Sequence, residues 1–509
     1  MSRAESKTMV KNTTFLYFRM FLIMIITLYT SRVTLKILGI TDFGIYSVVG
    51  GIVGLLFFLN NALSTSSSRF LAFDLGKNDL PHLIRTFSTL FSLHLILSVL
   101  IILLSETIGL WFLYNHLKIP AERFAVAVFI FHISVITCVL SIMQTPYTAA
   151  IIAHEKMNMY AFIGIFESVS KLGVVFLLKT SEFDKLKLYA ILIAAIQLII
   201  LVLYHRYCSR YFIETRYKPV IDKKIISMVA DFSGWSLLSG GSIALNLQGI
   251  NILTNMFFGP PVVSARSISL QINTMLVTFA NNFRTAINPQ IIKRYARDDR
   301  SGSETLVLIT TRYTYFLILL ITVPLVCKTG WVLNVWLDEV PEYTILFSQI
   351  IIIQNLFSVF DTGLYMSLYA KGQLKENALI SPLLGFLSFP VIYWLFKKGY
   401  GPVSLSWVFL IVHVVLGLVI KPILAVRIAN YRPKEIFRMF LLCFIISIIV
   451  FPVPLFLAWR LEDNWISFLL ISFLSTAIIS VSVFYLGIES DHRVKILSAL
   501  KNKLSISNS

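Results

Sequence analysis

One segment of this sequence combines two arginines with a regular series of hydrogen-bonding side chains. Polar residues recur there at alternating spacings of three and four, at Ser264, Ser267, Gln271, Thr274, Thr278, Asn281, Thr285 and Asn288. On a helix these side chains share one stripe about 100° wide. Arg266 and Arg284 are five helical turns apart, so they project from the same side, about 27 Å from each other. Because a guanidinium donates several hydrogen bonds in one plane, the pattern is typical of a site for an anion such as phosphate.

Two other segments carry candidate binding groups of the same kind. Gln248 and Asn251 share one face of the apolar run at 229–257, and Arg19 lies well inside the first apolar run. Small polar side chains also serve close helix packing, but a charge deep in a bilayer costs at least about 2.5 kcal/mol and normally faces a cavity or a partner. The arginines therefore favour a hydrated cavity. The candidate substrate-binding residues are Arg19, Gln248, Asn251, Arg266, Gln271, Asn281 and Arg284.

The few acidic side chains within apolar runs have both structural and ion-coupling interpretations. Glu167 and Lys171 are four residues apart and can neutralise each other on one helical face. Asp231 begins its predicted helix, where the helix dipole favours an anion, and Asp361 follows Gln354 along one face. Glu167, Asp231 and Asp361 are thus candidates for ion coupling, and the choice between H⁺ and Na⁺ stays open.

The elements that must position these residues are membrane-spanning helices. Of the 509 residues, 57% are hydrophobic and 14% are charged, against about 25% charged in soluble domains. The mean hydropathy is +0.79. About fourteen apolar runs reach the roughly 20 residues that an α-helix needs to cross a bilayer, and they lack the alternation of barrel strands. The predicted spans are 15–38, 42–66, 86–113, 123–145, 157–178, 186–207, 229–257, 262–287, 306–328, 343–369, 377–396, 402–425, 436–459 and 464–488.

The net charge of +18 is explained by the membrane rather than by nucleic acid. The largest basic clusters follow the sixth and eighth runs, at Arg206, Arg210, Arg216, Lys218, Lys223, Lys224 and at Lys293, Arg294, Arg297, Arg300. Since cytoplasmic loops are enriched in Lys and Arg, this placement predicts that both termini are cytoplasmic. We expect membrane lipids, and no nucleic acid, as partners.

A weak internal repeat suggests how the spans are grouped. Leu38-Gly39 matches Phe258-Gly259, Asn60-Asn61 matches Asn281-Asn282, and Asn78-Asp79 matches Asp298-Asp299, all at nearly the same offset. Copies of six spans enter the membrane in the same orientation. The predicted organisation is an N-lobe of helices 1–6 at 1–208, a cytoplasmic linker at 209–228, a C-lobe of helices 7–12 at 229–430, peripheral helices 13 and 14 at 431–488, and a cytoplasmic tail at 489–509.

The motifs of several enzyme classes are absent from the sequence. It contains no GxxxxGK[ST] phosphate loop, no HExxH and no CxxC pair, and its four cysteines have no metal-ligand spacing. We therefore expect no cofactor, no metal site and no catalytic residues, and we predict that the protein is not an enzyme. Transport would be driven by a gradient or by removal of the product.

The N-terminal stretch resembles a known family. Its residues Ser31-Arg32, Leu38-Gly39 and Asp42-Phe43-Gly44-Ile45-Tyr46 are similar to the start of bacterial polysaccharide-transport proteins, the O-antigen and capsule repeat-unit flippases of the multidrug/oligosaccharidyl-lipid/polysaccharide exporter superfamily. The similarity extends over nearly the whole chain as fourteen spans in a bipartite layout, although its local motifs are loose.

The resemblance implies two six-helix lobes in a V around a central cavity. It implies alternating access that moves an undecaprenyl-pyrophosphate-linked oligosaccharide across the bacterial inner membrane, with a glycan polymerase and a chain-length regulator as candidate partners. Arginines of the first and eighth helices of related flippases meet the pyrophosphate, and Arg19, Arg266 and Arg284 correspond to them by helix alone. The sugar, and the choice among O-antigen, capsule and exopolysaccharide, do not follow from the resemblance.

Two alternative functions stay open. A multidrug and toxin antiporter of the same superfamily would take cationic drugs, for which an acidic cavity is the simpler design. An integral-membrane glycan polymerase or ligase would be equally apolar and basic, but it would usually carry a large outer loop with catalytic residues, and the outer loops predicted here are short.

Overall fold

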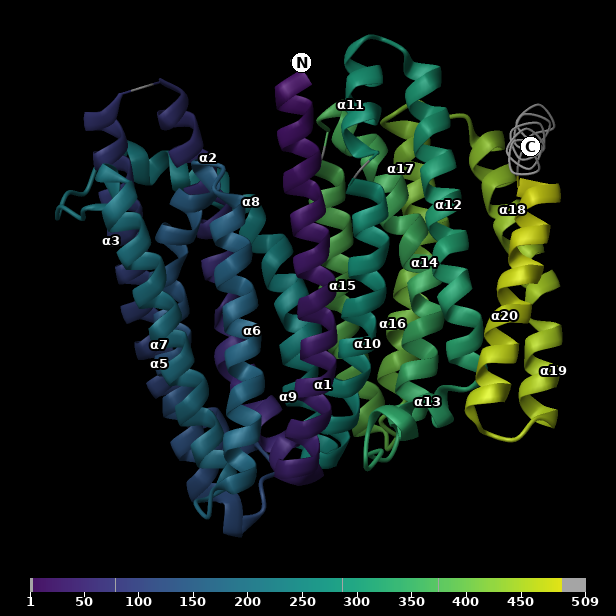
Figure 1. Ribbon diagram of the computed structural model, residues 1–509, viewed down its shortest axis with the longest axis horizontal. Helices are drawn as coiled ribbons and strands as arrows, with labels where there is room; N and C mark the ends of the chain where they lie inside the picture. The colour runs from purple at the N-terminus through teal and green to yellow at the C-terminus, as the bar shows by residue number, and fades with distance from the viewer. Residues whose placement is uncertain (1–2, 78, 286, 374, 488–509) are drawn as a thin grey trace, which may run out of the picture. The chain divides into compact units, whose positions relative to one another are not determined.

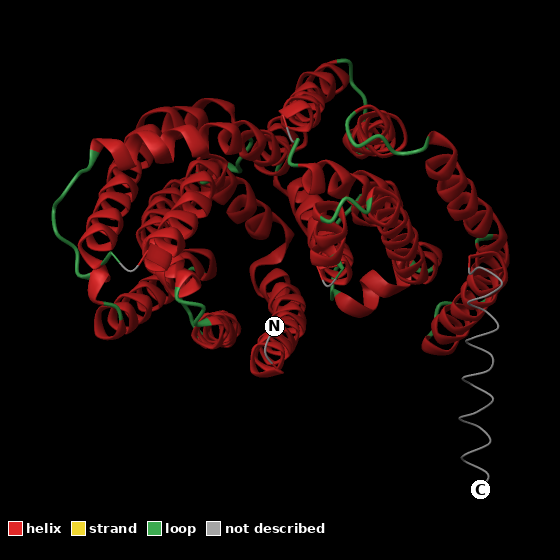
Figure 2. Ribbon diagram, turned by 90° about the horizontal axis from the view of Figure 1, so that it is seen from above, coloured by secondary structure: helices red, strands yellow, loops and turns green. Residues whose placement is uncertain are grey.

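The computed structural model describes residues 3–77, 79–285, 287–373 and 375–487, and within those ranges its regular structure is entirely helical (Figures 1 and 2). The all-α membrane class predicted from the apolar runs is confirmed. In the described part of the chain, 11 helical segments are long and apolar enough to cross a membrane. The predicted number of fourteen is not confirmed. Residues 42–56 belong to the same helical segment as the first predicted span, while 229–257 and 262–287 are helical without being among the 11.

The chain divides into two compact units. Unit 1 contains Met1–Gln271, Leu337–Thr344 and Ala378–Leu405, and unit 2 contains Ile272–Trp336, Ile345–Asn377 and Ser406–Ser509. This division differs from the predicted lobe boundaries, and the arrangement of six plus six helices stays a prediction. The predicted tail at 489–509 lies outside the described residues.

Unit 1 is built from the N-terminal helices and one later helix. They are α1 (Arg3–Leu56), α2 (Phe58–Lys77), α3 (Leu80–Leu104), α4 (Leu110–His116), α5 (Ala121–Ala153), α6 (Met157–Thr180), α7 (Lys185–Tyr211), α8 (Lys223–Ala244), α9 (Ile250–Phe258), the first part of α10 (Pro260–Thr285) and most of α15 (Lys375–Lys397). Short π-helical segments η1 (Ser105–Gly109) and η3 (Leu245–Gly249) and the 3₁₀ turn η2 (Ile213–Thr215) connect some of them. Helices α3, α5 and α7 pack around two apolar clusters, one of which includes Ile130 and Phe131 and the other Phe87 and Ile151.

Unit 2 continues from the second part of α10. Its other helices are α11 (Asn288–Ala296), α12 (Arg300–Cys327), α13 (Thr329–Trp336), α14 (Thr344–Lys371), α16 (Ser404–Val415), α17 (Lys421–Arg427), α18 (Pro433–Val450), α19 (Pro452–Arg460) and α20 (Trp465–Ser482), with π-helical segments η4 (Leu416–Ile420) and η5 (Val483–Gly487). One apolar cluster joins α12, α14 and α18. The last two predicted spans pack against α12, where Tyr315 Oη and Ser447 Oγ are 2.8 Å apart.

The glycines that match across the repeat adopt the same backbone conformation. Gly39 interrupts α1 with φ 78° and ψ 167°, and Gly259 ends α9 with φ 82° and ψ −177°. This region of backbone conformation is essentially restricted to glycine, which explains why each helix breaks at that residue. Asp79 and Asp299, which also match, cap the N-termini of α3 and α12 by accepting a backbone hydrogen bond at 3.1 and 2.9 Å, respectively.

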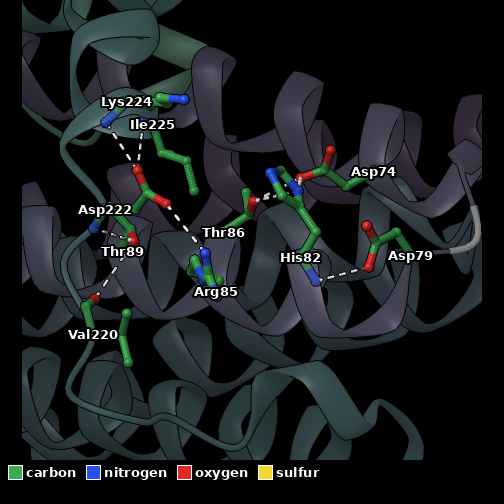
Figure 3. A network of polar contacts seen from close by, with 10 residues as sticks. All are labelled: Asp74, Asp79, His82, Arg85, Thr86, Thr89, Val220, Asp222, Lys224 and Ile225. Carbon is green, nitrogen blue, oxygen red and sulfur yellow. Dashed lines mark hydrogen bonds and ion pairs between the residues drawn. The ribbon is translucent and has the colours of Figure 1, made fainter.

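The start of α8 corrects one prediction. The side chain of Asp222 caps this helix by accepting hydrogen bonds from the backbone N–H groups of Lys224 at 2.9 Å and Ile225 at 3.4 Å (Figure 3). Asp231 therefore lies in the interior of α8, and its interpretation as an N-terminal cap is wrong because the helix begins several residues earlier than the apolar run. The side chain of Asp231 lies outside the described part of the structure.

The segment between α7 and α8 is tied to α3. The N–H of Asp222 donates to Thr89 Oγ1 at 3.2 Å, and Arg85 places a guanidinium nitrogen 3.7 Å from the Asp222 carboxylate (Figure 3). The hydroxyl of Tyr217 lies 3.1 Å from Ser92 Oγ. This predicted linker thus lies against α3 within unit 1.

Candidate functional site

The first part of α10, which carries Arg266, is held closely against α1. Ser264 Oγ donates to the carbonyl of Ile40 at 2.6 Å, directly after the break in α1. A Cβ atom at Gly44 would clash with the carbonyl of Pro260. Because glycine permits this close approach of the two backbones, the start of α10 and the second half of α1 form one rigid support within unit 1.

Arg266 is buried within unit 1, where its side chain is oriented by η3 and α9. The residue is 5% exposed. Its Nε donates to Asn251 Oδ1 at 2.8 Å, and its Nη2 donates to the backbone carbonyl of Asn246 at 2.9 Å. Of the predicted binding residues, Arg266 and Asn251 are therefore brought together, and the amide orients the guanidinium.

The π-helical segment η3 supplies the carbonyl that Arg266 uses. A π-turn shifts the regular hydrogen bonds by one residue, and such turns frequently occur at functional sites. The side chain of Asn246, in the same segment, accepts a hydrogen bond from Ser388 Oγ of α15 at 2.8 Å. Helix α15 comes close because Gly385 lies against Ser242 and Asn246.

Gln248 and Gln271, two further predicted binding residues, lie in two other parts of unit 1. The side chain of Gln248 faces α1. A Cβ atom added at Gly51 would lie 3.1 Å from Gln248 Oε1, and one added at Gly54 would lie 3.5 Å from Gln248 Cδ. Gln271 lines a cavity together with Glu167 and Lys171. The two members of this ion pair are 2.6 Å apart, as their spacing on α6 predicts.

In unit 2, Arg284 lies at the end of α10 and is 7% exposed. Its Nη2 donates to Asn281 Oδ1 at 2.5 Å, and its Nη1 donates to Thr362 Oγ1 of α14. Both acceptors are neutral oxygens. Asp361, the residue before Thr362, interacts electrostatically with Arg284.

A lysine outside the predicted binding residues completes this group. Lys421 Nζ is 3.0 Å from Asp361 Oδ1, and it also donates to Asn377 Oδ1. It begins α17 directly after η4, whose Gly417 lies against the carbonyl of Phe357 of α14. Lys421 lies inside the predicted span 402–425, so its position within an apolar run was the signal that could have identified it.

The group formed by Arg284, Lys421, Asp361, Asn281 and Thr362 is termed the unit 2 charge cluster below. It contains two cations and one carboxylate, and the apolar cluster of unit 2 packs beside it. Two cations against one carboxylate give the group an excess of positive charge, so it suits an anionic ligand better than a cationic one. The remaining predicted site residue, Arg19, belongs to α1, but its side chain lies outside the described part.

An ion pair in unit 1 joins α1 to the segment at Leu337–Thr344. Arg32 donates to Asp338 at 3.0 Å, and Lys36 forms an ion pair with the same carboxylate. Asp338 lies outside the apolar helices. The hydrogen bonds from Lys36 and then Arg32 lower the pKa of Asp338 below its ordinary value. These two cations of α1, which lie just before its break at Gly39, are thus partly neutralised.

Solved transporter structures have the same fold. A multidrug resistance MATE family transporter of the MOP superfamily, in an inward-facing conformation, matches with a TM-score of 0.65 and 13% sequence identity, covering 81% of this chain and 96% of that chain. The chain has the fold of this MOP-superfamily transporter. The lipid II flippase MurJ, in an inward closed conformation, matches this chain with a TM-score of 0.71 and 12% identity, covering 92% of this chain and 98% of that chain.

A third MOP structure comes from Pyrococcus furiosus Vc1 and is described as having a binding pocket of reverse polarity. It matches with a TM-score of 0.59 and 14% identity, covering 82% of this chain and 96% of that chain. No protein-family model matches the sequence. No curated protein matches it either. At these identities the comparisons show the fold alone, and transport and its substrate have to be argued from the residues.

Proposed function

We propose that the chain is a flippase for lipid-linked oligosaccharides. Its substrate would be an undecaprenyl-pyrophosphate-linked repeat unit, moved by alternating access for the synthesis of O-antigen, capsule or exopolysaccharide. The observation that carries this proposal is Arg284, a buried guanidinium that donates to the neutral oxygens of Asn281 and Thr362 while Asp361 is bound by Lys421. The fold of the MOP transporters supports the transport part of the proposal.

The physical requirement for such a protein is a route for the headgroup. A pyrophosphate with attached sugars carries charges and many hydroxyls, each of which is costly to place in hydrocarbon without a partner. Arg284 and Arg266 would bind phosphate oxygens in turn, because guanidinium and phosphate form paired, charge-assisted hydrogen bonds. The polyprenyl tail needs no partner and would stay in lipid.

The proposal places the protein in the bacterial inner membrane with both termini in the cytoplasm, in agreement with the predicted distribution of Lys and Arg. Membrane lipids and the lipid-linked substrate are the partners that it requires. A glycan polymerase and a chain-length regulator would act on the product. No chemical step is assigned to the chain, because translocation breaks no covalent bond.

The proposal is tested in vesicles that contain the purified protein. A fluorescent undecaprenyl-pyrophosphate oligosaccharide is placed in one leaflet, and its accessibility to a membrane-impermeant quencher is followed over time. Faster equilibration than in protein-free vesicles supports the flippase. Failure with several neutral and acidic oligosaccharides, together with uptake of a small organic cation, would instead support a multidrug antiporter, which the likeness to MATE transporters makes the main competitor.

A further inference from the structure

Unit 1 contains a polar cavity that is separate from the surroundings of Arg266. It has a volume of about 400 Å³ and lies among α1, α6, α7 and Gln271 of α10. Its α1 wall is formed by residues at helical spacing, including Thr27, Thr30 and Thr34, and its α6 wall includes Glu167 and Lys171. The volume lies within the range of about 300–1,000 Å³ that is typical of small-molecule sites. It also exceeds the roughly 30 Å³ of a single water by more than tenfold.

The walls of this cavity hold hydrogen-bonding groups without protein partners. Among the described residues, Thr30 Oγ1, Ser31 Oγ and Gln271 Oε1 are buried atoms for which no hydrogen-bond partner is found. All three residues line the cavity. A buried polar atom without a partner costs about 1–3 kcal/mol. These three side chains therefore retain hydrogen-bonding capacity that a polar ligand in the cavity can use.

The charged groups of the cavity are balanced. Glu167 Oε1 and Lys171 Nζ are 2.6 Å apart, and each side chain is partly exposed. An ion would therefore compete with an existing partner, whichever sign it carried. Among the described residues there is also no group of three or more His, Cys, Asp or Glu side chains that could hold a metal ion. The cavity consequently suits a neutral group.

The remaining walls restrict the ligand further. Tyr189 of α7 packs edge-on against Tyr46, with ring centroids 4.9 Å apart, and Phe43 provides a second aromatic surface. Some walls of the cavity thus carry hydroxyl, amide and ion-pair groups, and others present aromatic surfaces. This combination matches a ring that carries many hydroxyls on an otherwise apolar frame.

We propose that this cavity binds a neutral sugar residue, and that Gln271, Thr30 and Ser31 hydrogen-bond its hydroxyls. The inference rests on the proposed function for the source of that sugar, which would be the oligosaccharide headgroup of the lipid-linked substrate. A free sugar has the same chemistry. The cavity would then give unit 1 a role in recognising the glycan, distinct from the binding of pyrophosphate by arginine.

The first test measures binding without transport. Methyl glycosides of glucose, galactose, mannose, rhamnose and N-acetylglucosamine are presented to the full chain in nanodiscs, and saturation-transfer NMR detects contact. We expect at least one glycoside to bind, and Gln271→Leu to weaken it about fivefold through the loss of one hydrogen bond. The control Thr137→Val lines a different cavity of unit 1, and its hydroxyl donates only to its own helix at Ile133, so it should bind as the wild type does.

The second test separates this inference from the proposed function. Vesicles are loaded with undecaprenyl pyrophosphate either bearing an oligosaccharide or without sugar. We expect Gln271→Leu and Ser31→Ala to slow movement of the glycosylated lipid several-fold while leaving the sugar-free lipid unchanged, which also shows that the variants are folded. Binding of a glycoside without movement of either lipid would refute the flippase but keep the sugar site. Absence of glycoside binding, or equal slowing of both lipids, would refute the sugar site.

Discussion

The ammonium of Lys421 lies 3.0 Å from the carboxylate of Asp361, and the exposed fractions of the two side chains are 3% and 18%. Lys421 is thus an internal ion-pair partner of Asp361, which was one of the predicted ion-coupling residues. Coupling of Na⁺ through Asp361 would require Lys421 to withdraw first. The pair is more simply understood as positioning α14 and α17 around Arg284.

Breaking this pair should destabilise the protein strongly. Lys421→Met leaves a largely buried carboxylate without its cation and is expected to lower the free energy of unfolding by about 3 kcal/mol. Lys171→Met, which breaks the more exposed pair with Glu167, should cost less than about 1 kcal/mol. Denaturant titration in mixed micelles measures both, and Lys421→Met combined with Asp361→Leu should recover most of the loss. Equal effects of the two lysine variants would contradict the assigned burial.

The two glycines at helix breaks should not tolerate a side chain. Gly39→Ala and Gly259→Ala place a Cβ at positive φ and are each expected to lower the free energy of unfolding by about 1–3 kcal/mol. Gly50→Ala is the matched control, because it lies within α1 with nothing within 4 Å of the added Cβ, and it should be neutral or slightly stabilising. If all three variants unfold alike, the positive-φ conformation of the helix breaks is refuted.

The ion pairs of Asp338 predict a pH dependence for the segment at Leu337–Thr344. Because Lys36 and Arg32 lower its pKa, the paired carboxylate stabilises the segment at all pH values above the ordinary 3.8, and this stabilisation disappears as the pH falls through the lowered pKa. A spin label at Glu339→Cys should be immobile from about pH 7 to about pH 4 and mobile only below that range. In Asp338→Asn the label should be mobile throughout. An unchanged spectrum in that variant would rule out the proposed restraint.

Short-range relationships were predictable from the sequence, whereas contacts between helices were not. The pairing of Glu167 with Lys171 follows from a spacing of four residues, and that of Arg284 with Asn281 from a spacing of three. The break at Gly39 was indicated by its match with Gly259.

The partners of the buried cations depend on tertiary packing. Lys421 meets Asp361 from a helix sixty residues further along the chain, and no local pattern connects them. Arg266 uses the carbonyl of Asn246, which a π-helical segment presents, and Gln271 shares a cavity with α6 rather than with the arginines of its own helix. Helical periodicity assigns a face, but the neighbour of that face is set by how the helices pack.

The central claim, that a buried guanidinium in unit 2 binds the anionic part of a lipid-linked glycan, is tested most directly by Arg284→Gln. Its movement of undecaprenyl-pyrophosphate oligosaccharide is measured in vesicles beside Arg284→Lys and the wild type. Loss of a charge-assisted hydrogen bond predicts at least about tenfold slower transport by Arg284→Gln and partial recovery in Arg284→Lys. Transport by Arg284→Gln at the rate of the wild type, with the variant folded and inserted, would contradict the account.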